Sequence, residues 1–153
     1  MRMIRISFSG LFVATSACLT GCGGCGSSGP IILPQSDAEK NLTNIVLAYL
    51  DAQEEIHHNP KNAEEIKPFL KRFGDPNQIL VSPTDGEPYV VVWGAGLQGG
   101  PTPYHQMFPI IAYEKKGSGG KRAIVDVRGR TMTVPNEDFT QLTFVGGHKP
   151  AAN

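Results

Sequence analysis

The sequence lacks the cysteine pairs on which many small secreted domains depend. Only three of its 153 residues are cysteines, and Cys18, Cys22 and Cys25 all lie near the N-terminus. A framework of disulfides therefore cannot hold the rest of the chain together. We expect one small domain that is stabilised by its own hydrophobic core.

The sequence also lacks an excess of either charge. Lys and Arg together number 14, and so do Asp and Glu. Without Arg2 and Arg5, which lie in an N-terminal segment that we expect to be removed, 12 basic and 14 acidic residues remain, a formal net charge of −2. This balance predicts neither a nucleic-acid partner nor a polybasic surface for membranes.

Motifs that carry catalysis or hold a cofactor are scarce as well. The chain has no GxSxG nucleophile motif, and the GxGxxG pattern that begins at Gly94 is followed by Gly and Pro where a dinucleotide site needs a helix. Glu54, His57 and His58 cluster at the end of a predicted helix, where Glu54 and His58 lie four apart on one face. This spacing could supply two metal ligands, whereas a zinc site needs three or four from the protein. We predict no catalytic residue, no metal and no cofactor, and hence no enzyme.

The N-terminus has the layout of an export signal. Arg2 and Arg5 precede an apolar stretch at residues 6–19 that is interrupted by Ser, Gly and Thr. This stretch is too short and too polar for a spanning helix, which needs roughly 20 apolar residues. We predict a signal peptide over residues 1–21.

The next residues, Leu19, Thr20, Gly21 and Cys22, resemble the lipobox of bacterial lipoproteins at every position. The resemblance implies that lipid is attached to Cys22, that a peptidase cuts before it, and that the protein is anchored to the inner or outer membrane of a bacterial cell envelope with its domain outside the cytoplasm. Acyl chains then serve as the anchor. For Cys25 a second acylation, an intermolecular bridge and no role all remain open.

After the lipobox, residues 22–36 are rich in Gly, Ser and Pro and predict a flexible tether. Ser36 and Glu39 then match a capping box, and apolar residues recur at helical spacing. This pattern predicts a long amphipathic helix over residues 37–58, with its apolar side in the core; the apolar positions are Leu42, Ile45, Val46, Tyr49 and Ile56.

A second, shorter helix is predicted where Asn62 and Glu65 can cap it, with a kink or two short turns at Pro68 and an end at residues 74–76. Short β-branched runs then predict strands at residues 89–93, 110–114, 123–127 and 131–134. Connections of hairpin length indicate that the last three strands form an antiparallel meander.

The C-terminal part of the domain is predicted to end in a short helical segment. Asn136 is expected to cap it, while Phe139 and Leu142 reach back to the core. We expect a single α+β domain over residues 37–144, with the long helix packed on a small antiparallel sheet of about four strands, and a disordered tail at residues 145–153.

The loop at residues 95–109 is long for a connection within a compact domain. It carries Tyr104, His105, Met107 and Phe108, which makes it the candidate loop for contact with a partner.

The stretch from residue 59 to residue 93 resembles the globular domain of type II secretion pseudopilins. Asp85, Gly86, Pro88 and Tyr89 match the DPWGxPY-like turn that leads into the sheet of that family. The resemblance implies a pseudopilin-like fold. Pseudopilins carry a long apolar N-terminal helix through which they stack, whereas this chain has a lipobox, so the resemblance does not imply assembly into a pilus.

The leading functional hypothesis is a lipid-anchored cell-envelope protein whose domain is a non-enzymatic structural or interaction module. Its expected partners are the membrane, through the N-terminal lipid, and another envelope protein. The alternative is an extracytoplasmic ligand-binding or enzymatic domain that uses the loop at residues 95–109.

Overall fold

A computed structural model describes residues 35–97 and 108–150 of the chain. The predicted signal peptide, the lipobox and the tether up to residue 34 lie outside the described residues. Within the described parts, no helix is both long enough and apolar enough to cross a membrane.

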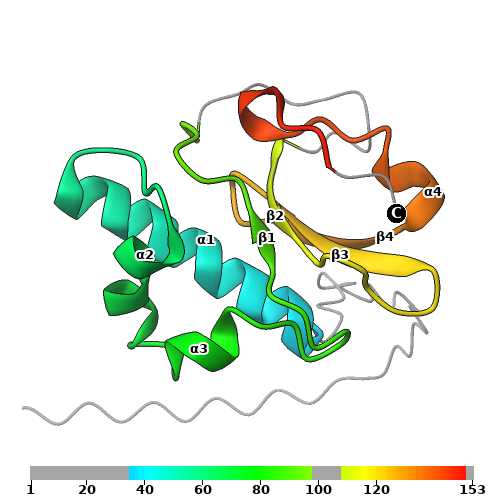
Figure 1. Cartoon of the computed structure of the whole chain (residues 1–153), viewed down its shortest axis with the longest axis horizontal. Coiled ribbons are helices and arrows are strands. Elements are labelled where there is room, and N and C mark those ends of the chain that lie inside the picture. The colour runs from blue at the N-terminus through cyan, green and yellow to red at the C-terminus, as the bar shows by residue number, and fades with distance from the viewer. Residues whose placement is uncertain (1–34, 98–107, 151–153) are drawn as a thin grey trace, which may run out of the picture. The chain divides into compact units, whose positions relative to one another are not determined.

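The domain has an α+β architecture with one antiparallel sheet (Figure 1). Its elements, in chain order, are α1 (Asp37–Ile56), α2 (Ala63–Leu70), α3 (Pro76–Ile79), β1 (Val90–Val91), β2 (Ile110–Tyr113), β3 (Lys121–Asp126), β4 (Thr131–Pro135), α4 (Asn136–Phe139) and the 3-10 turn η1 (Val145–Gly147). The four strands lie in the sheet in the order in which they occur in the chain. The predicted meander of the last three strands is confirmed.

Helix α1 begins at the predicted capping box. The Ser36 hydroxyl accepts a hydrogen bond from the backbone N–H of Glu39, and the Glu39 carboxylate accepts one from the N–H of Ser36. The helix ends at His57, which adopts a left-handed conformation with φ 57°. The capping box satisfies backbone N–H groups that the start of a helix leaves unpaired.

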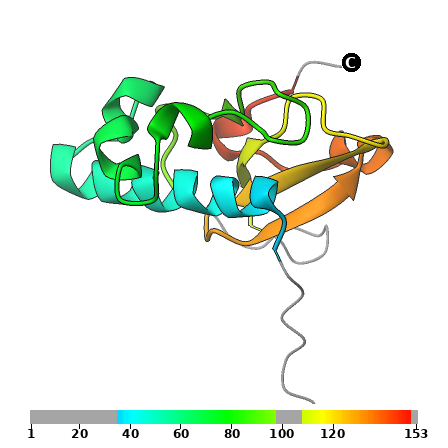
Figure 2. The ribbon, with the colours of Figure 1, turned by 90° about the horizontal axis from the view of Figure 1, so that it is seen from below.

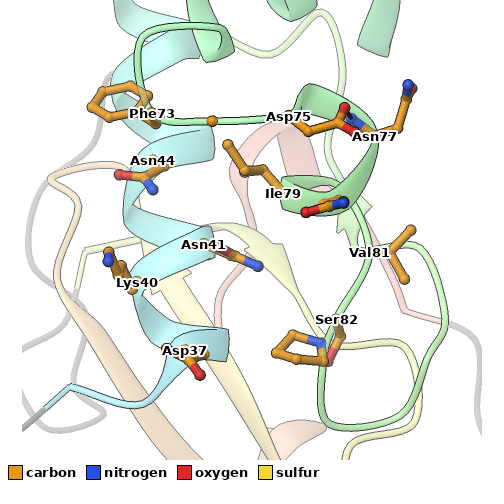
Figure 3. Close-up of a pocket in the computed structure, with 13 residues that line it drawn as sticks. Asp37, Lys40, Asn41, Asn44, Phe73, Asp75, Asn77, Ile79, Val81 and Ser82 are labelled. Carbon is orange, nitrogen blue, oxygen red and sulfur yellow. Dashed lines mark hydrogen bonds between the residues drawn. The ribbon is translucent and has the colours of Figure 1, made fainter.

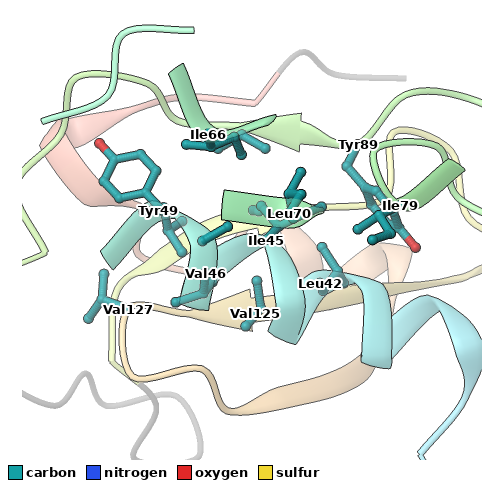
Figure 4. Packing of buried hydrophobic residues seen from close by; sticks show 14 of the residues in the cluster. Leu42, Ile45, Val46, Tyr49, Ile66, Leu70, Ile79, Tyr89, Val125 and Val127 are labelled. Carbon is teal, nitrogen blue, oxygen red and sulfur yellow. The ribbon is translucent and has the colours of Figure 1, made fainter. Parts of the chain in front are cut away.

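The core lies between α1, α2 and one face of the sheet (Figure 4). The apolar side of α1 supplies buried residues at the predicted positions, except that Ile56 is only half-buried. Ile66 and Leu70 close the core from α2, while Val125 and Val127 face it from the sheet. Figure 2 shows α2 and α3 on the same side of α1.

A change of register in β2 alters which residues face this core. Ile110 pairs with Asp126, whereas Ala112 pairs with Val125, so β2 has one extra residue between these two pairs. The extra residue places Ile111 and Ala112 in the same core cluster, although neighbours in a regular strand point to opposite faces.

Several predicted elements differ from the structure. The strand predicted at residues 89–93 is only two residues long, because the N–H of Tyr89 bonds to Leu80 and a turn begins at Trp93 and Gly94. Of the two alternatives predicted at Pro68, the two separate short turns are wrong, since α2 continues through this exposed residue.

The segment after α2 contains a helix that was not predicted. Residues 74–76 were expected only to end α2, but α3 begins at Pro76. The Asp75 carboxylate accepts a hydrogen bond from the N–H of Asn77, and proline is favoured at the first position of a helix.

The C-terminal predictions also need correction. Asn136 does not cap α4; its side chain accepts a hydrogen bond from Arg122 Nε at 2.8 Å instead. Residues 145–150 do not belong to a disordered tail, because Val145 is buried and the His148 Nε2 atom lies 3.0 Å from the Tyr113 hydroxyl. Phe139 and Leu142 are buried as predicted.

Candidate functional site: a groove lined by amide side chains

One wall of the candidate site is the polar side of the first half of α1. The capping box sets where the helix begins, so Asp37, Lys40, Asn41 and Asn44 fall at a spacing of three or four residues and share one side. Figure 3 shows these four side chains on α1, with the amide of Asn41 directed toward the neighbouring segment that contains α3 and the amide of Asn44 lying beside Phe73.

The opposite wall is the segment from Phe73 to Ile79. Gly74 has φ 145°, a conformation that other residues rarely adopt, and Asp75 then caps α3. Gln78 lines the groove from α3, and the buried side chain of Ile79 projects toward α1 (Figure 3). Asn77 also belongs to the lining, although Figure 3 shows its side chain directed away from α1.

An open groove with a volume of about 610 Å³ lies between these two walls. We call it the amide groove; it is lined by Asp37, Lys40, Asn41, Asn44, Phe73, Gly74, Asp75, Asn77, Gln78, Ile79, Val81, Ser82 and Pro83. Its size falls within the range of about 300–1,000 Å³ that is typical of ligand sites. The lining combines three Asn, one Gln, one Lys and two Asp with several apolar side chains.

Several of these polar groups are available for a ligand. Within residues 35–97 and 108–150, the side chains of Lys40, Asn44 and Gln78 make no hydrogen bond or ion pair with another residue. Asn44 is half-buried and belongs to the lining of the groove. Each primary amide offers two donors and one acceptor.

At one end of the groove, the Ser82 hydroxyl already has hydrogen-bond partners within the domain. The Ser82 hydroxyl donates to Glu114 Oε1 at 2.6 Å and accepts from the N–H of Thr84. Glu114 is itself buried and also accepts from the N–H of Ala123 at 2.7 Å. These bonds make Ser82 an anchor for the turn that follows it.

Tyr89 fixes the position of α1 against this turn. Its hydroxyl donates to the carbonyl of Ala38 at 3.1 Å. Burial raises the pKa of Tyr89 well above its usual value, while hydrogen bonds from Ser82 and Asn41 lower it by less. The phenol is therefore neutral at all ordinary pH values, and Tyr89 serves as a positioning residue for Asn41 and α1.

Of the four residues predicted for contact with a partner, three lie outside the described residues: Tyr104, His105 and Met107. Phe108 is described, and it packs on the domain: its N–H donates to Asp126 Oδ2 at 3.4 Å, and the Arg128 guanidinium lies 4.3 Å from its ring centre. Asp126 is fully buried and also accepts from the N–H groups of Arg128 and Arg130.

The other end of this loop is also fixed. The Tyr49 hydroxyl donates to the carbonyl of Ala95 at 2.8 Å, and burial raises the pKa of Tyr49 to about 12. The N–H of Gly94 donates to the carbonyl of Pro60, and the Asn59 amide donates to the carbonyl of Gly94. Both ends of the loop are thus attached to the same domain.

The contacts of the two histidines near the end of α1 indicate a structural role. His57 is the C-cap, and His58 Nδ1 lies 3.9 Å from Glu65 Oε2. In the described part of the chain, no three His, Cys, Asp or Glu side chains lie close enough together to hold a metal ion.

The amide groove was not predicted from the sequence. The amphipathic pattern places Lys40 and Asn44 on the polar side of the predicted helix and indicates nothing more about them. The Asp75-Pro76 pair could have indicated the start of α3, but nothing in the sequence shows that α3 lies opposite Asn44.

Comparisons with protein-family models, with curated proteins and with solved structures found no match for this chain. The candidate site therefore rests on the contacts, distances and burial described above.

Proposed function

We propose that this protein is a lipid-anchored component of a bacterial cell envelope, cleaved before Cys22, whose α+β domain is a non-enzymatic interaction module. One observation carries the proposal: two arginines, an apolar stretch and the box Leu19, Thr20, Gly21, Cys22 occur together and in the correct order.

The start of the domain supports a tether between lipid and fold. The Gln35 amide donates to Thr43 Oγ1 at 3.0 Å and to Thr131 Oγ1 at 2.9 Å, so residue 35 is bound to both α1 and β4. Gln35 and Ser36 thus belong to the domain, and the tether of residues 22–36 shortens to residues 22–34. The 13 peptide units between Cys22 and Gln35 span at most about 45 Å, which bounds the distance from the lipid to the domain.

The turn that resembles pseudopilins supports a structural role within the domain. The Asp85 carboxylate accepts hydrogen bonds from the N–H groups of Lys116 and Gly117 at 2.9 and 2.8 Å. It also accepts one from the N–H of Glu87, and Gly86 has φ 69°. We propose that this turn serves the same end as in pseudopilins, which is to join the helical part of the domain to its sheet.

The lipid proposal is tested by metabolic labelling with a fatty-acid analogue in a bacterium that processes lipoproteins. The wild-type chain and a Cys25→Ala variant should both carry the label. The Cys22→Ala variant should carry none and should keep its 21 N-terminal residues, because the sulfur that accepts the lipid is missing. Label on Cys22→Ala, or its loss from Cys25→Ala alone, would refute the assignment of Cys22.

A further inference from the structure

We propose that the amide groove binds an uncharged, hydroxyl-rich ligand, and specifically a neutral oligosaccharide. This proposal deepens the interaction role proposed above and rests on it for the compartment in which the ligand is met. It concerns the groove between α1 and α3, where Asn44 and Gln78 lie on opposite walls.

The hydrogen-bonding groups of the groove match neighbouring hydroxyls. A hydroxyl both donates and accepts, and so does a primary amide, which presents its acceptor beside its two donors. Asn44 and Gln78 use none of these groups within the described residues, so water must satisfy them until a ligand does. Lys40, one helical turn before Asn44, adds a further donor.

The apolar part of the lining suits the C–H faces of a sugar ring. Ile79 is directed toward α1, and Val81 also belongs to the lining (Figure 3). Phe73 lies at the end of the groove beside Asn44, and the Arg72 guanidinium lies 4.4 Å from its ring centre. A site that joins a few directed polar groups with apolar contact surface is the usual arrangement in small-ligand sites.

The charges of the groove disfavour an anionic ligand. Lys40 is the one cation of the lining, and Asp37 and Asp75 are carboxylates. A site for phosphate or carboxylate normally gathers several cationic side chains, or several backbone N–H groups that point at the anion. The groove therefore fits a neutral ligand better than a nucleotide or a polyanion.

The walls of the groove also disfavour an extended peptide. Such peptides commonly add a strand to the free edge of a sheet, where backbone groups bind them. Here the walls are α1 and the segment with α3, and they present side chains to the groove. An amphipathic helix would need an apolar groove, whereas eight of the thirteen lining residues carry polar or charged side chains.

Binding to an array of neutral, sulfated and phosphorylated glycans tests the proposal. The full chain is used, purified in a detergent without a sugar headgroup, since a glycoside detergent would compete for the site. We expect neutral glycans to be bound. If no glycan is bound, or if only the anionic glycans are bound, the proposal is overturned.

Variants then locate the site with the best neutral glycan from the array. Asn44→Ala and Gln78→Ala should each weaken binding about fivefold to tenfold, because each removes the hydrogen bonds of one amide. Gln141→Ala is the matched control: this exposed amide follows α4 and does not line the groove, so its removal should leave affinity unchanged. Equal affinity of all three variants would overturn the proposed site.

Side-chain amide signals in NMR spectra give a readout that does not depend on a variant. The glycan should shift the NH₂ signals of Asn44 and Gln78 and leave that of Gln141 in place. A shift produced by an unstructured polar peptide but not by the glycan would overturn the proposal in favour of a peptide site. Cys22→Ala should bind the glycan as wild type does, so failure of the groove and failure of the lipid anchor are distinguishable.

Discussion

The two faces of the sheet are covered in different ways. On one face, α1 packs against β2 and β3 along a continuous apolar core. On the other face, a smaller cluster is covered by α4 and the chain that follows it; its buried members are Ile110, Tyr113, Ile124, Val134, Phe139, Leu142 and Phe144. We call the first the helix face and the second the aromatic face.

The faces also differ in the forces that hold them. The helix face is stabilised mainly by burial of aliphatic side chains. On the aromatic face, Tyr113, Phe139 and Phe144 meet edge to face with ring centres 4.9–5.5 Å apart, and the buried Arg122 lies over Phe139 at 4.1 Å. A short, poorly helical segment can therefore cover a sheet when rings and a cation give it directed contacts.

The largest effect is expected on the helix face. Leu42→Ala should lower the free energy of unfolding by about 3 kcal/mol, because Leu42 is completely buried and the substitution leaves a cavity. Chemical denaturation followed by circular dichroism measures the change. Leu47→Ala is the control on the same helix: Leu47 is 39% exposed, and its loss should change stability by less than about 0.5 kcal/mol. Similar losses for both would contradict the packing of α1.

An intermediate effect is expected on the aromatic face. Arg122→Met should lower the free energy of unfolding by about 2 kcal/mol, since it removes the cation over Phe139 and leaves Asn136 Oδ1 and the carbonyl of Lys115 without their donor. Lys121→Met, at the exposed neighbouring position of β3, should have little effect. If Arg122→Met unfolded at the same denaturant concentration as wild type, apolar contacts alone would explain this face.

The smallest effect is expected for the pH dependence of stability, through Asp85 at the polar end of the sheet near Arg122. Burial alone would raise the pKa of Asp85, but backbone hydrogen bonds from Glu87, Gly117 and Lys116 outweigh it, and the pKa lies below its usual value. A lowered pKa means that the ionised group stabilises the fold above the unfolded-state pKa and that this contribution is lost as pH falls through the folded-state pKa.

Asp85→Asn should therefore be less stable than wild type by about 1 kcal/mol at neutral pH, and the difference should shrink below about pH 4. Thermal unfolding of both proteins between neutral and acid pH measures it. Leu42→Ala should show no such convergence with wild type, because the helix face owes its stability to apolar burial. A constant difference for Asp85→Asn would show that its carboxylate is not tied to the hairpin.

The helix face was predictable because its signals are local. The capping box of Ser36 and Glu39 and the apolar stripe from Leu42 to Tyr49 depend only on spacing within one helix. The strands and their hairpins were predictable for the same reason, although β1 is shorter than expected because turns at Leu80 and Trp93 compete for its backbone groups.

The burial of Phe139 and Leu142 was predictable, but the other contacts of the aromatic face and the groove were not, because they depend on contacts between distant residues. Asn136 looked like a helix cap, but Arg122, 14 positions earlier, takes its side-chain oxygen. His148 looked like part of a tail, but Tyr113 binds it from 35 positions away. Asn44 and Gln78 likewise come together only after α2 has reversed the chain.

The two fixed ends of the loop between Ala95 and Phe108 bear on how this protein can be altered. Tyr49 holds one end and Asp126 the other, so each described end has its own contact with the domain. Doubling the length of such a connection costs only about 0.6 kcal/mol in closure entropy. A reporter peptide or epitope tag inserted there should leave the scaffold intact, which makes this segment a suitable graft site for following the protein in living cells.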